Sequence, residues 1–393
     1  MAQSEVLIVG GGGHIGLPLS LFLANKKKRV TILDISKTTI NQINAKKMPF
    51  YEPGCQELLE SCIHNHSLIA TTSLAEFKNS SWKVVIVVIG TQLLSSGEPD
   101  REGVLKCVGN IVQYIAKNGL LVLRSTIFPG TTHSVQEYLS NLDRSDIKVI
   151  FAPERIAEGF ALDELEKLPQ IIGADDPEGF AMGKEFFENL GIRVIHTKCL
   201  EAEFIKLITN AYRFAHFALG NAIYLATQKV NLNYSALMKV MKDDYPRLAS
   251  LPKSGYVGGP CLIKDTIQLQ SYLEGVSPMT HFALETNQNL LQNTIQTVVE
   301  IASRNGFTRV GILGITFKAE SDDIRESPIL IVMKELSKTG FDIKYFDPYA
   351  KTADFEFVTL DNLLRVSEIV VIGTPHDQFS NLEIIQPVIN VWQ

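Results

Sequence analysis

A glycine-rich turn near the start of the chain constrains its fold more than any other feature. The apolar run Val6–Val9 leads into Gly11-x-Gly13-x-x-Gly16, and a segment of helical character follows at 18–25. Glycines at this spacing permit a tight turn, let a pyrophosphate approach the backbone, and open a helix whose N-terminus attracts the anion. The pattern predicts a strand–turn–helix unit that binds a dinucleotide, against the alternative of an ordinary glycine-rich turn.

A single acid indicates which dinucleotide this is. Asp34 ends the predicted second strand, 29–33, and lies 18 residues after Gly16. A carboxylate at this point can accept hydrogen bonds from a ribose diol, and it would repel the extra phosphate of NADP. We therefore expect NAD as the cofactor.

Short β-branched runs and helical segments alternate through the first half of the chain. Further strands are predicted at 84–89, 120–123, 148–151 and 170–173. This alternation predicts an α/β fold with a doubly wound, mostly parallel sheet.

The middle of the chain changes character, and its end returns to the first pattern. Helices are predicted at 201–229, 234–242, 266–272 and 282–303, with a turn-rich insert at 244–264. Strands are predicted at 309–313, 342–346, 368–372 and 387–391, with a helix at 328–338. The second strand of this last part ends at Asp347, as the second strand of the chain ends at Asp34, which indicates either an internal repeat or a coincidence between similar α/β units. We place the domains at 1–199, 200–304 and 305–393.

Charge and hydropathy narrow the classes of partner. The chain carries a net charge of −6 over 393 residues, and its longest basic run is 26–29. Proteins that wrap duplex nucleic acid carry a strong positive excess, so nucleic acid is not an expected partner. The N-terminus lacks a basic and apolar leader, and the run 84–89 is far shorter than the roughly 20 apolar residues that span a bilayer. We expect no membrane partner.

The five cysteines are scattered and form no CxxC pair. This spacing argues against a disulfide framework or a zinc site and indicates a reducing, cytoplasmic location. The eight histidines show no metal-ligand spacing that we regard as specific, so we expect no metal.

One cysteine stands in an unusual setting. Cys261 follows Gly258-Gly259-Pro260 and precedes Lys264-Asp265. Nearby cations favour the thiolate, which is the reactive form of the side chain. Cys261 is therefore a candidate nucleophile, with a buried structural cysteine as the alternative, and we interpret the other four as structural.

Four polar residues of the predicted long helix share one face. Glu203, Lys206, Asn210 and Arg213 are spaced i, i+3, i+7 and i+10. Such a row is usually a solvated face with an intrahelical Glu–Lys pair. The segment around Cys261 is a partner motif that would turn it into part of an active site.

Two polar segments, 125–132 and 153–159, each follow a predicted strand. Open α/β sheets place their ligands at the carboxyl ends of strands. Ser125, Thr126 and Glu154 are therefore candidate ligand contacts.

In combination these motifs resemble those of the UDP-glucose/GDP-mannose dehydrogenase family along nearly the whole chain. The matching motifs are Gly11–Gly16 with Leu17-Pro18, Tyr51-Glu52-Pro53-Gly54, 125–132, 153–159, 203–210, the Cys261 segment, Phe317-Lys318, and Asp323-x-Arg325-x-Ser327-Pro328. The resemblance implies two Rossmann-like, doubly wound parallel-sheet domains joined by a long central helix and a helical dimerisation region. It also implies an N-terminal NAD domain, a C-terminal domain that holds a UDP-sugar, and a homodimer or dimer of dimers.

The implied reaction is a four-electron oxidation of a sugar C6 alcohol to a carboxylate with two NAD. The resemblance makes Cys261 the nucleophile, while Lys206 and Asn210 stabilise oxyanions and Asp265 assists deprotonation through water. An ordinary two-electron alcohol or hydroxyacid dehydrogenase, or a non-catalytic nucleotide-sugar binder, are the alternatives.

The remaining site residues are also implied by the resemblance. Glu154 is the base that activates the hydrolytic water, and Thr126 positions that water. The implied cofactor contacts are Gly11, Gly13, His14, Ile15, Gly16, Asp34, Thr91, Ser125, Thr126 and Arg325. The implied substrate contacts are Glu154, Arg155, Lys206, Asn210, Arg213, Arg247, Tyr256, Gly258 and Lys318, of which Arg247 reaches the neighbouring subunit's substrate.

The chain also departs from the family pattern. Gly10 and Gly12 replace larger residues, so we expect a more flexible loop, and Arg124 stands where many members carry an acid. Glu154-Arg155 and Tyr212-Arg213 resemble the members that oxidise 2-acetamido sugars. A UDP-N-acetylhexosamine is therefore the expected substrate, with UDP-glucose next.

Overall fold

The computed structural model describes residues 5–77, 80–91, 93–94, 99–352 and 354–393. They form two compact units, Met1–Leu207 and Ile208–Gln393. The division falls within the longest helix, α8, which spans Cys199–Lys229. The three-domain division at 199 and 304 stays a prediction.

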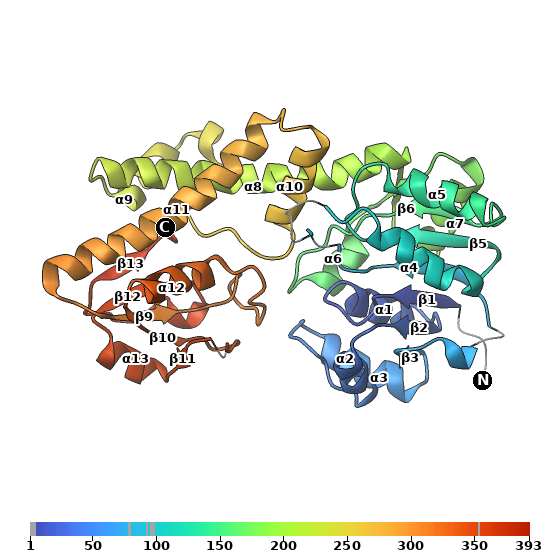
Figure 1. The fold of residues 1–393 in the computed structure, drawn as a ribbon, viewed down its shortest axis with the longest axis horizontal. Helices are drawn as coiled ribbons and strands as arrows, with labels where there is room; N and C mark the ends of the chain where they lie inside the picture. The colour runs from blue at the N-terminus through green and yellow to red at the C-terminus, as the bar shows by residue number, and fades with distance from the viewer. Residues whose placement is uncertain (1–4, 78–79, 92, 95–98, 353) are drawn as a thin grey trace. The chain divides into compact units, whose positions relative to one another are not determined.

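The first unit is built on an eight-stranded sheet in the order β3-β2-β1-β4-β5-β6-β7-β8 (Figure 1). Its strands are β1 Val6–Val9, β2 Val30–Leu33, β3 Leu68–Thr71, β4 Trp82–Val87, β5 Ile115–Leu123, β6 Lys148–Phe151, β7 Gln170–Gly173 and β8 Val194–Thr197. Its other helices are α1 Gly16–Asn25, α2 Lys37–Asn44, α3 Cys55–His64, α4 Gly103–Ile111, α5 Thr131–Asn141, α6 Ala161–Lys167 and α7 Pro177–Glu188.

The central strands of this sheet are continuous apolar runs because helices cover both of its faces. Along β1, Val6 and Ile8 pack with Leu17 and Leu21 of α1 on one face. Leu7 and Val9 pack into a second cluster on the other face, with residues of α4 and α5. A strand buried on both faces has no polar position to alternate with, which is the pattern typical of parallel sheets.

The sheet is parallel except between β6 and β7, which pair in antiparallel orientation. The predicted class of fold is confirmed, but two strands, β3 and β8, were missing from the sequence prediction. Both lie at the sheet edges, and Ile69, Ile195 and His196 point outward from them. Edge strands are partly exposed, and their apolar runs are shorter than those of the central strands, with three residues in β3 and two in β8.

The second unit contains a five-stranded parallel sheet in the order β11-β10-β9-β12-β13. Its strands are β9 Arg309–Leu313, β10 Asp342–Phe346, β11 Glu356–Phe357, β12 Ile369–Ile372 and β13 Val388–Asn390. Its helices are α9 Tyr234–Lys242, α10 Leu262–Tyr272, α11 Pro278–Asn305, α12 Pro328–Lys338 and α13 Leu360–Val366. The strand order repeats β3-β2-β1-β4-β5 of the first unit, so the internal repeat exists at the level of the fold.

One helix boundary bears directly on the site. The predicted helix 266–272 begins four residues earlier, at Leu262. The glycines and Pro260 just before it made this first turn resemble part of the insert. Because α10 starts at Leu262, Cys261 lies at the N-terminal end of a helix and not inside a loop.

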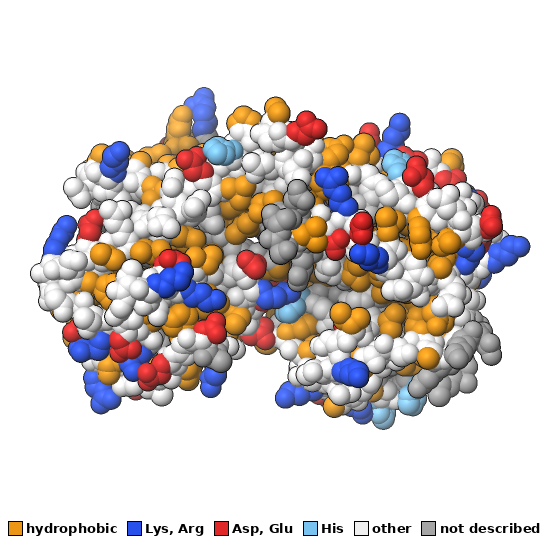
Figure 2. Space-filling model, viewed as in Figure 1, with side chains coloured by type: hydrophobic (Ala, Val, Ile, Leu, Met, Phe, Trp, Pro, Cys, Tyr) orange, Lys and Arg blue, Asp and Glu red, His pale blue; other side chains and the backbone are white. Residues whose placement is uncertain are grey.

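The surface charges and the apolar character of the helices bear on the kinds of partner that the sequence predicts. On the face shown in Figure 2, Lys and Arg side chains are interspersed with Asp and Glu. Within the described ranges, no helix has both the length and the apolar character that a bilayer crossing requires.

Candidate functional site

The glycine loop forms a tight turn in front of α1. A Cβ on Gly16 would lie 2.5 Å from the carbonyl oxygen of Gly10, so no larger residue fits there. A Cβ on Gly13 would meet nothing closer than 3.8 Å, which leaves open space beside the loop. Ile15 precedes α1 and supplies no side-chain cap to its N–H groups. An open cradle at an uncapped helix N-terminus fits the pyrophosphate of NAD.

Asp34 is oriented by two backbone amides at the end of β2. The Gly12 amide donates to Oδ2 at 2.9 Å and the Ser36 amide donates to Oδ1 at 3.0 Å. An ionised carboxylate has about four acceptor positions, and the half-buried Asp34 keeps two of them for a ribose diol. A Cβ on Gly12 would lie 2.9 Å from Oδ2. Glycine at 12, which suggested flexibility, thus has a steric role in bringing Asp34 to the loop.

We expect Asp34→Ala to weaken NAD selectively. Hydrogen bonds to a charged group contribute ~1.5–3 kcal/mol, so the KM for NAD should rise about tenfold to a hundredfold. The KM for NADP should change little, because the carboxylate repels its extra phosphate in the native protein. Initial rates with each cofactor measure this, and a native protein that uses NADP as readily as NAD would contradict it.

Several predicted cofactor residues meet at the carboxyl ends of β4 and β5. The Thr91 hydroxyl donates to the carbonyl oxygen of Thr126, and the Ser125 hydroxyl donates to that of Ile89 at 2.7 Å. His14 stacks on Phe50 with their ring centroids 4.0 Å apart. These contacts fix Thr91, Ser125 and Thr126 at the edge of the sheet where α/β proteins bind ligands.

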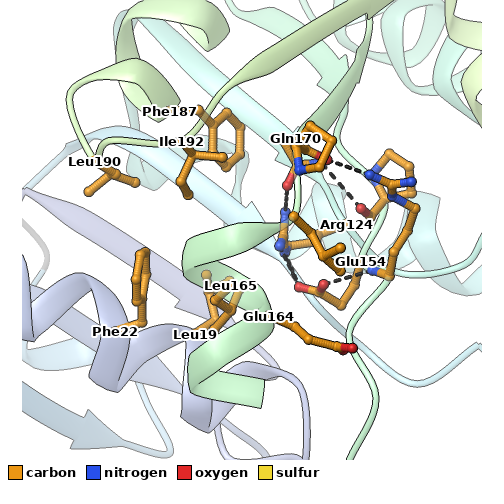
Figure 3. A pocket seen from close by; sticks show the side chains of 14 residues that line it. Leu19, Phe22, Arg124, Glu154, Glu164, Leu165, Gln170, Phe187, Leu190 and Ile192 are labelled. Carbon is orange, nitrogen blue, oxygen red and sulfur yellow. Dashed lines mark hydrogen bonds and ion pairs between the residues drawn. The ribbon is translucent and has the colours of Figure 1, made fainter. Parts of the chain in front are cut away.

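Glu154 is held by a buried guanidinium (Figure 3). Arg124 directly follows β5, and its Nε and one terminal nitrogen donate to Glu154 Oε2, the first at 2.9 Å. Its other terminal nitrogen donates to Gln170 Oε1 at 2.7 Å and to the Ala152 carbonyl oxygen at 3.1 Å. Arg124, Glu154 and Gln170 are 3%, 7% and 6% exposed. This network joins β5, β7 and the segment after β6.

The second oxygen of Glu154 is occupied as well. Oε1 accepts the backbone amides of Arg155 at 2.7 Å and Ile156 at 3.0 Å. The Arg155 guanidinium donates to the carbonyl oxygen of Pro169, and burial lowers its pKa. A carboxylate that accepts four N–H groups has no acceptor position left. To take a proton, Glu154 must therefore give up one of these donors.

Two other acids of the matching motifs are structural. Glu52 accepts the backbone amides of Gly159 at 2.8 Å and Ala161 at 2.9 Å, and so fixes the segment after Glu154. Glu203 caps the start of α5, where it accepts the amides of Gly130 at 2.6 Å and Thr132 at 2.8 Å. Burial raises the pKa of Glu203. The interpretation of this helix face as solvated is wrong for Glu203, whereas Lys206 on the same face is half-buried.

Asn210 and the Cys261 segment come together in the second unit. The Asn210 amide donates to Asp265 Oδ2 at 2.6 Å, and Lys264 Nζ lies 3.3 Å from Asp265 Oδ1. Asp265 is fully buried one turn into α10, while Cys261 at the start of the helix is exposed. The alternative of a buried cysteine is therefore wrong. The N-terminus of a helix favours a thiolate, and Lys264 follows Cys261 within the first turn of α10.

Four predicted substrate residues line one cavity of about 390 Å³ in the second unit. They are Arg213, Tyr256, Gly258 and Lys318. The cavity wall also includes Lys253, Phe317, Pro375 and Trp392, which the sequence analysis did not select. The sequence could have identified Pro375, because Thr374-Pro375-His376 follows a predicted strand as the other polar segments do. Trp392 carried no such signal.

Five predicted substrate contacts do not line this cavity, namely Glu154, Arg155, Lys206, Asn210 and Arg247, and neither does the predicted cofactor contact Arg325. Arg247 lies in a short 3₁₀ turn, Pro246–Leu248, and lines a different cavity of about 490 Å³ with Tyr212 and His216. Arg325 is oriented by Asp323, whose carboxylate accepts its Nε at 2.9 Å.

Known proteins match this arrangement along the whole chain. Three models of the UDP-glucose/GDP-mannose dehydrogenase family match: the NAD binding domain at 4–191, the central domain at 200–289 and the UDP binding domain at 311–390. A UDP-N-acetyl-D-mannosamine dehydrogenase of Methanococcus maripaludis is 29% identical over 96% of this chain and 87% of its own length.

Solved structures share the fold. The UDP-D-ManNAc dehydrogenase from Pyrococcus horikoshii has a TM-score of 0.90 at 24% identity, covering 99% of this chain and 95% of that chain. A UDP-glucose dehydrogenase from Pyrobaculum islandicum has a TM-score of 0.87 at 22% identity, covering 100% and 94%. The resemblance seen in the motifs and the choice of NAD are confirmed. With its glycine loop and Asp34 in a matched NAD domain and Lys318 in a matched UDP domain, the chain belongs to the UDP-glucose/GDP-mannose dehydrogenase family of NAD-dependent oxidoreductases.

Proposed function

We propose that the chain oxidises the C6 alcohol of a UDP-N-acetylhexosamine to the carboxylate, with UDP-N-acetylmannosamine as the first candidate and UDP-glucose as the second. The observation that carries the proposal is the exposed Cys261 at the start of α10, one turn before the buried Asp265 that Asn210 contacts. A two-electron dehydrogenase has no use for a nucleophilic thiol. The relative named for N-acetylmannosamine supports the choice of sugar.

The Cys261 thiolate is the nucleophile of the proposed reaction. NAD would be held by the glycine loop and Asp34 and would accept one hydride in each oxidation, so a second NAD would replace the first NADH before the second oxidation. The sulfur attacks the C6 aldehyde and forms a carbon–sulfur bond, which places negative charge on the C6 oxygen. Lys206 and Asn210, one turn apart on α8, supply the N–H groups that stabilise this oxyanion. Asp265 orients the Asn210 amide and, in the first oxidation, takes up the proton of the C6 hydroxyl through a water molecule.

Hydrolysis completes the proposed reaction. Water attacks the thioester carbon, the carbon–sulfur bond breaks, and the uronate leaves while the Cys261 thiolate is regenerated. Glu154 is the proposed base for this water, and Thr126 the residue that positions it. The full set of donors on Glu154 implies that one of them is displaced as the carboxylate takes the proton.

Arg213 is the residue that we propose to select the acetamido group. It lines the cavity together with Lys318 and Tyr256, whereas the Arg155 guanidinium is committed to the Pro169 carbonyl oxygen. A guanidinium offers fixed donors that suit an amide oxygen. Losing a hydrogen bond to a charged group costs ~1.5–3 kcal/mol, or about a tenfold to hundredfold loss of kcat/KM.

The test is a turnover panel of UDP-N-acetylmannosamine, UDP-N-acetylglucosamine and UDP-glucose with NAD. We expect Arg213→Ala to depress kcat/KM for the acetamido sugar far more than for UDP-glucose. The matched variant Arg304→Ala, at an exposed side chain in the last turn of α11, should change neither. Equal losses on both substrates, or a native preference for UDP-glucose, would overturn the acetamido assignment and leave the 6-dehydrogenase reaction standing.

We also propose a homodimer or a dimer of dimers. Exposed apolar side chains on α8 and α9 support it, since Tyr212 is 60%, Leu219 47% and Val240 76% exposed. Arg247, which lies away from the nucleotide cavity, would then serve the neighbouring subunit's site. Light scattering should give about two or four times the chain mass of 43.6 kDa. An active monomer would refute the proposal.

A further inference from the structure

One buried imidazole holds both ends of a loop that lines the nucleotide cavity. Residues 317–319 follow β9 and form part of the cavity wall, as does Pro375 after β12. His376 comes next in the chain and is only 1% exposed, so it lies behind the wall and not in the cavity. The sequence analysis gave it no role.

His376 forms hydrogen bonds with three residues: Thr316 and Glu320 on either side of 317–319, and Asp347 after β10. The Glu320 amide donates to Nδ1 at 3.1 Å. Nε2 lies 3.2 Å from the Thr316 hydroxyl oxygen and 3.1 Å from Asp347 Oδ2. Because a backbone N–H donates to Nδ1, that nitrogen is an acceptor and Nε2 carries the hydrogen. The ring therefore donates toward the Asp347 carboxylate while it receives the Glu320 amide.

These bonds fix the loop immediately before and after its three half-buried residues, 317–319. Thr316 and Glu320 flank 317–319, and both contact the ring. The Thr316 hydroxyl also donates to the carbonyl oxygen of Lys318 at 2.8 Å. Its own carbonyl oxygen accepts the Thr374 hydroxyl from the segment after β12. The His376 ring thus acts together with these bonds to fix the position of Lys318 in the cavity wall.

The internal repeat allows Asp347, which His376 contacts, to be compared with Asp34 of the first unit. Asp347 ends β10 as Asp34 ends β2, and it accepts the amides of Ile315 at 2.7 Å and Tyr349 at 2.8 Å, matching the two bonds of Asp34. Asp347 also accepts the Ala350 amide at 2.9 Å and the His376 ring.

All four acceptor positions of Asp347 are therefore used, and the residue is 3% exposed. Burial opposes ionisation of Asp347, but the bonds from His376 and the backbone amides lower its pKa. A ribose diol cannot reach this carboxylate as it can reach Asp34. Within the second unit, the place for a nucleotide is the cavity whose wall His376 holds.

We propose that His376 is a positioning residue of the nucleotide-sugar site, which fixes residues 317–319 so that Lys318 and Phe317 face the ligand. This rests on the proposed function, since it assumes that a UDP-sugar occupies the cavity of Arg213 and Tyr256. The ring itself does not contact the ligand. Its loss should therefore change the binding of the nucleotide sugar and not the chemical steps at Cys261.

The test is a set of three substitutions read as KM against kcat. His376→Phe removes all three hydrogen-bond contacts of the ring, His376→Asn retains an acceptor for the Glu320 amide, and His376→Gln retains a donor for Asp347. We expect His376→Phe to raise the KM for the nucleotide sugar and the Kd for UDP about tenfold or more. The kcat and the KM for NAD should stay within about twofold of the native values, and Asn and Gln should give intermediate KM values.

A matched control separates positioning from general stability. Tyr345→Phe removes two hydrogen bonds of a buried side chain in the same sheet, with the Thr352 amide at 2.7 Å and the Thr352 carbonyl oxygen at 3.0 Å. Tyr345 is not among the residues that line the cavity. This variant should keep the native KM and the native Kd for UDP. Binding of UDP alone can be followed by the fluorescence of Trp392.

An unchanged KM and Kd in His376→Phe would overturn the inference and leave the proposed function intact. If that variant does not fold, His376→Asn decides in the same way. Equal shifts in Tyr345→Phe and His376→Phe would reduce His376 to a structural role, which also overturns the inference. A native protein that neither binds UDP nor turns over nucleotide sugars would instead remove the proposed function, and the inference with it.

Discussion

Cys261→Ser is expected to lower uronate formation by a factor of about 10³ or more while the protein stays folded. The side chain is exposed at the start of α10, so the smaller oxygen leaves no core cavity. A serine hydroxyl stays protonated at neutral pH and is a far weaker nucleophile than a thiolate. We expect the aldehyde or an ester-level species to accumulate, which mass spectrometry of the nucleotide-sugar products would detect.

Alkylation of the native protein provides a matched control for this variant. Burial raises the pKa of Cys55 to about 12 and of Cys107 to about 11, and it raises those of Cys62 and Cys199 as well. Below those pKa values these thiols stay neutral, so at pH 8 iodoacetamide should label Cys261 first and block activity in parallel. Full uronate production by Cys261→Ser would sink the covalent role.

Lys206→Ala is expected to lower kcat about 10²–10³-fold, which corresponds to ~2.7–4 kcal/mol of transition-state stabilisation. The ammonium on α8 is the proposed partner of the C6 oxyanion, and this interaction exists only when charge develops there. Alanine is the best helix former, so α8 should persist and the unfolding temperature should change little. Steady-state kinetics and circular dichroism on the same samples check both points.

Lys229→Ala is the control for Lys206→Ala, since Lys229 is an exposed lysine in the last turn of the same helix. It should retain native kcat. A loss below about tenfold in Lys206→Ala would mean that the oxyanion is stabilised chiefly by other groups, against the ~2.7 kcal/mol expected for one such donor.

Much of the fold was predictable because its central elements are buried on both faces. The strands β1, β6, β7, β9 and β10 match the predicted ranges, as do α9 and α12. Each is a short apolar or periodic run between clear turn residues. The edge strands β3 and β8 were missed because they are partly exposed and their apolar runs are only three and two residues long.

The candidate site was only partly predictable, because its important contacts join residues that are distant in sequence. Arg124 and Glu154 are 30 residues apart, and Arg124 was noted only as a departure from the family pattern. His376 contacts Asp347, Glu320 and Thr316 across 29, 56 and 60 residues. A motif lies within a few consecutive residues, so it could identify Cys261 and Asp34 but not the groups that hold Glu154 or Lys318.

The most direct test of the central claim is the number of NADH molecules formed per molecule of nucleotide sugar consumed. The reaction would be run to completion with UDP-N-acetylmannosamine, with NADH read by absorbance and the sugar product by mass. The account predicts two NADH per product and a carboxylate at C6. One NADH per product, with an aldehyde or ketone as the final product and no loss in Cys261→Ser, would contradict it.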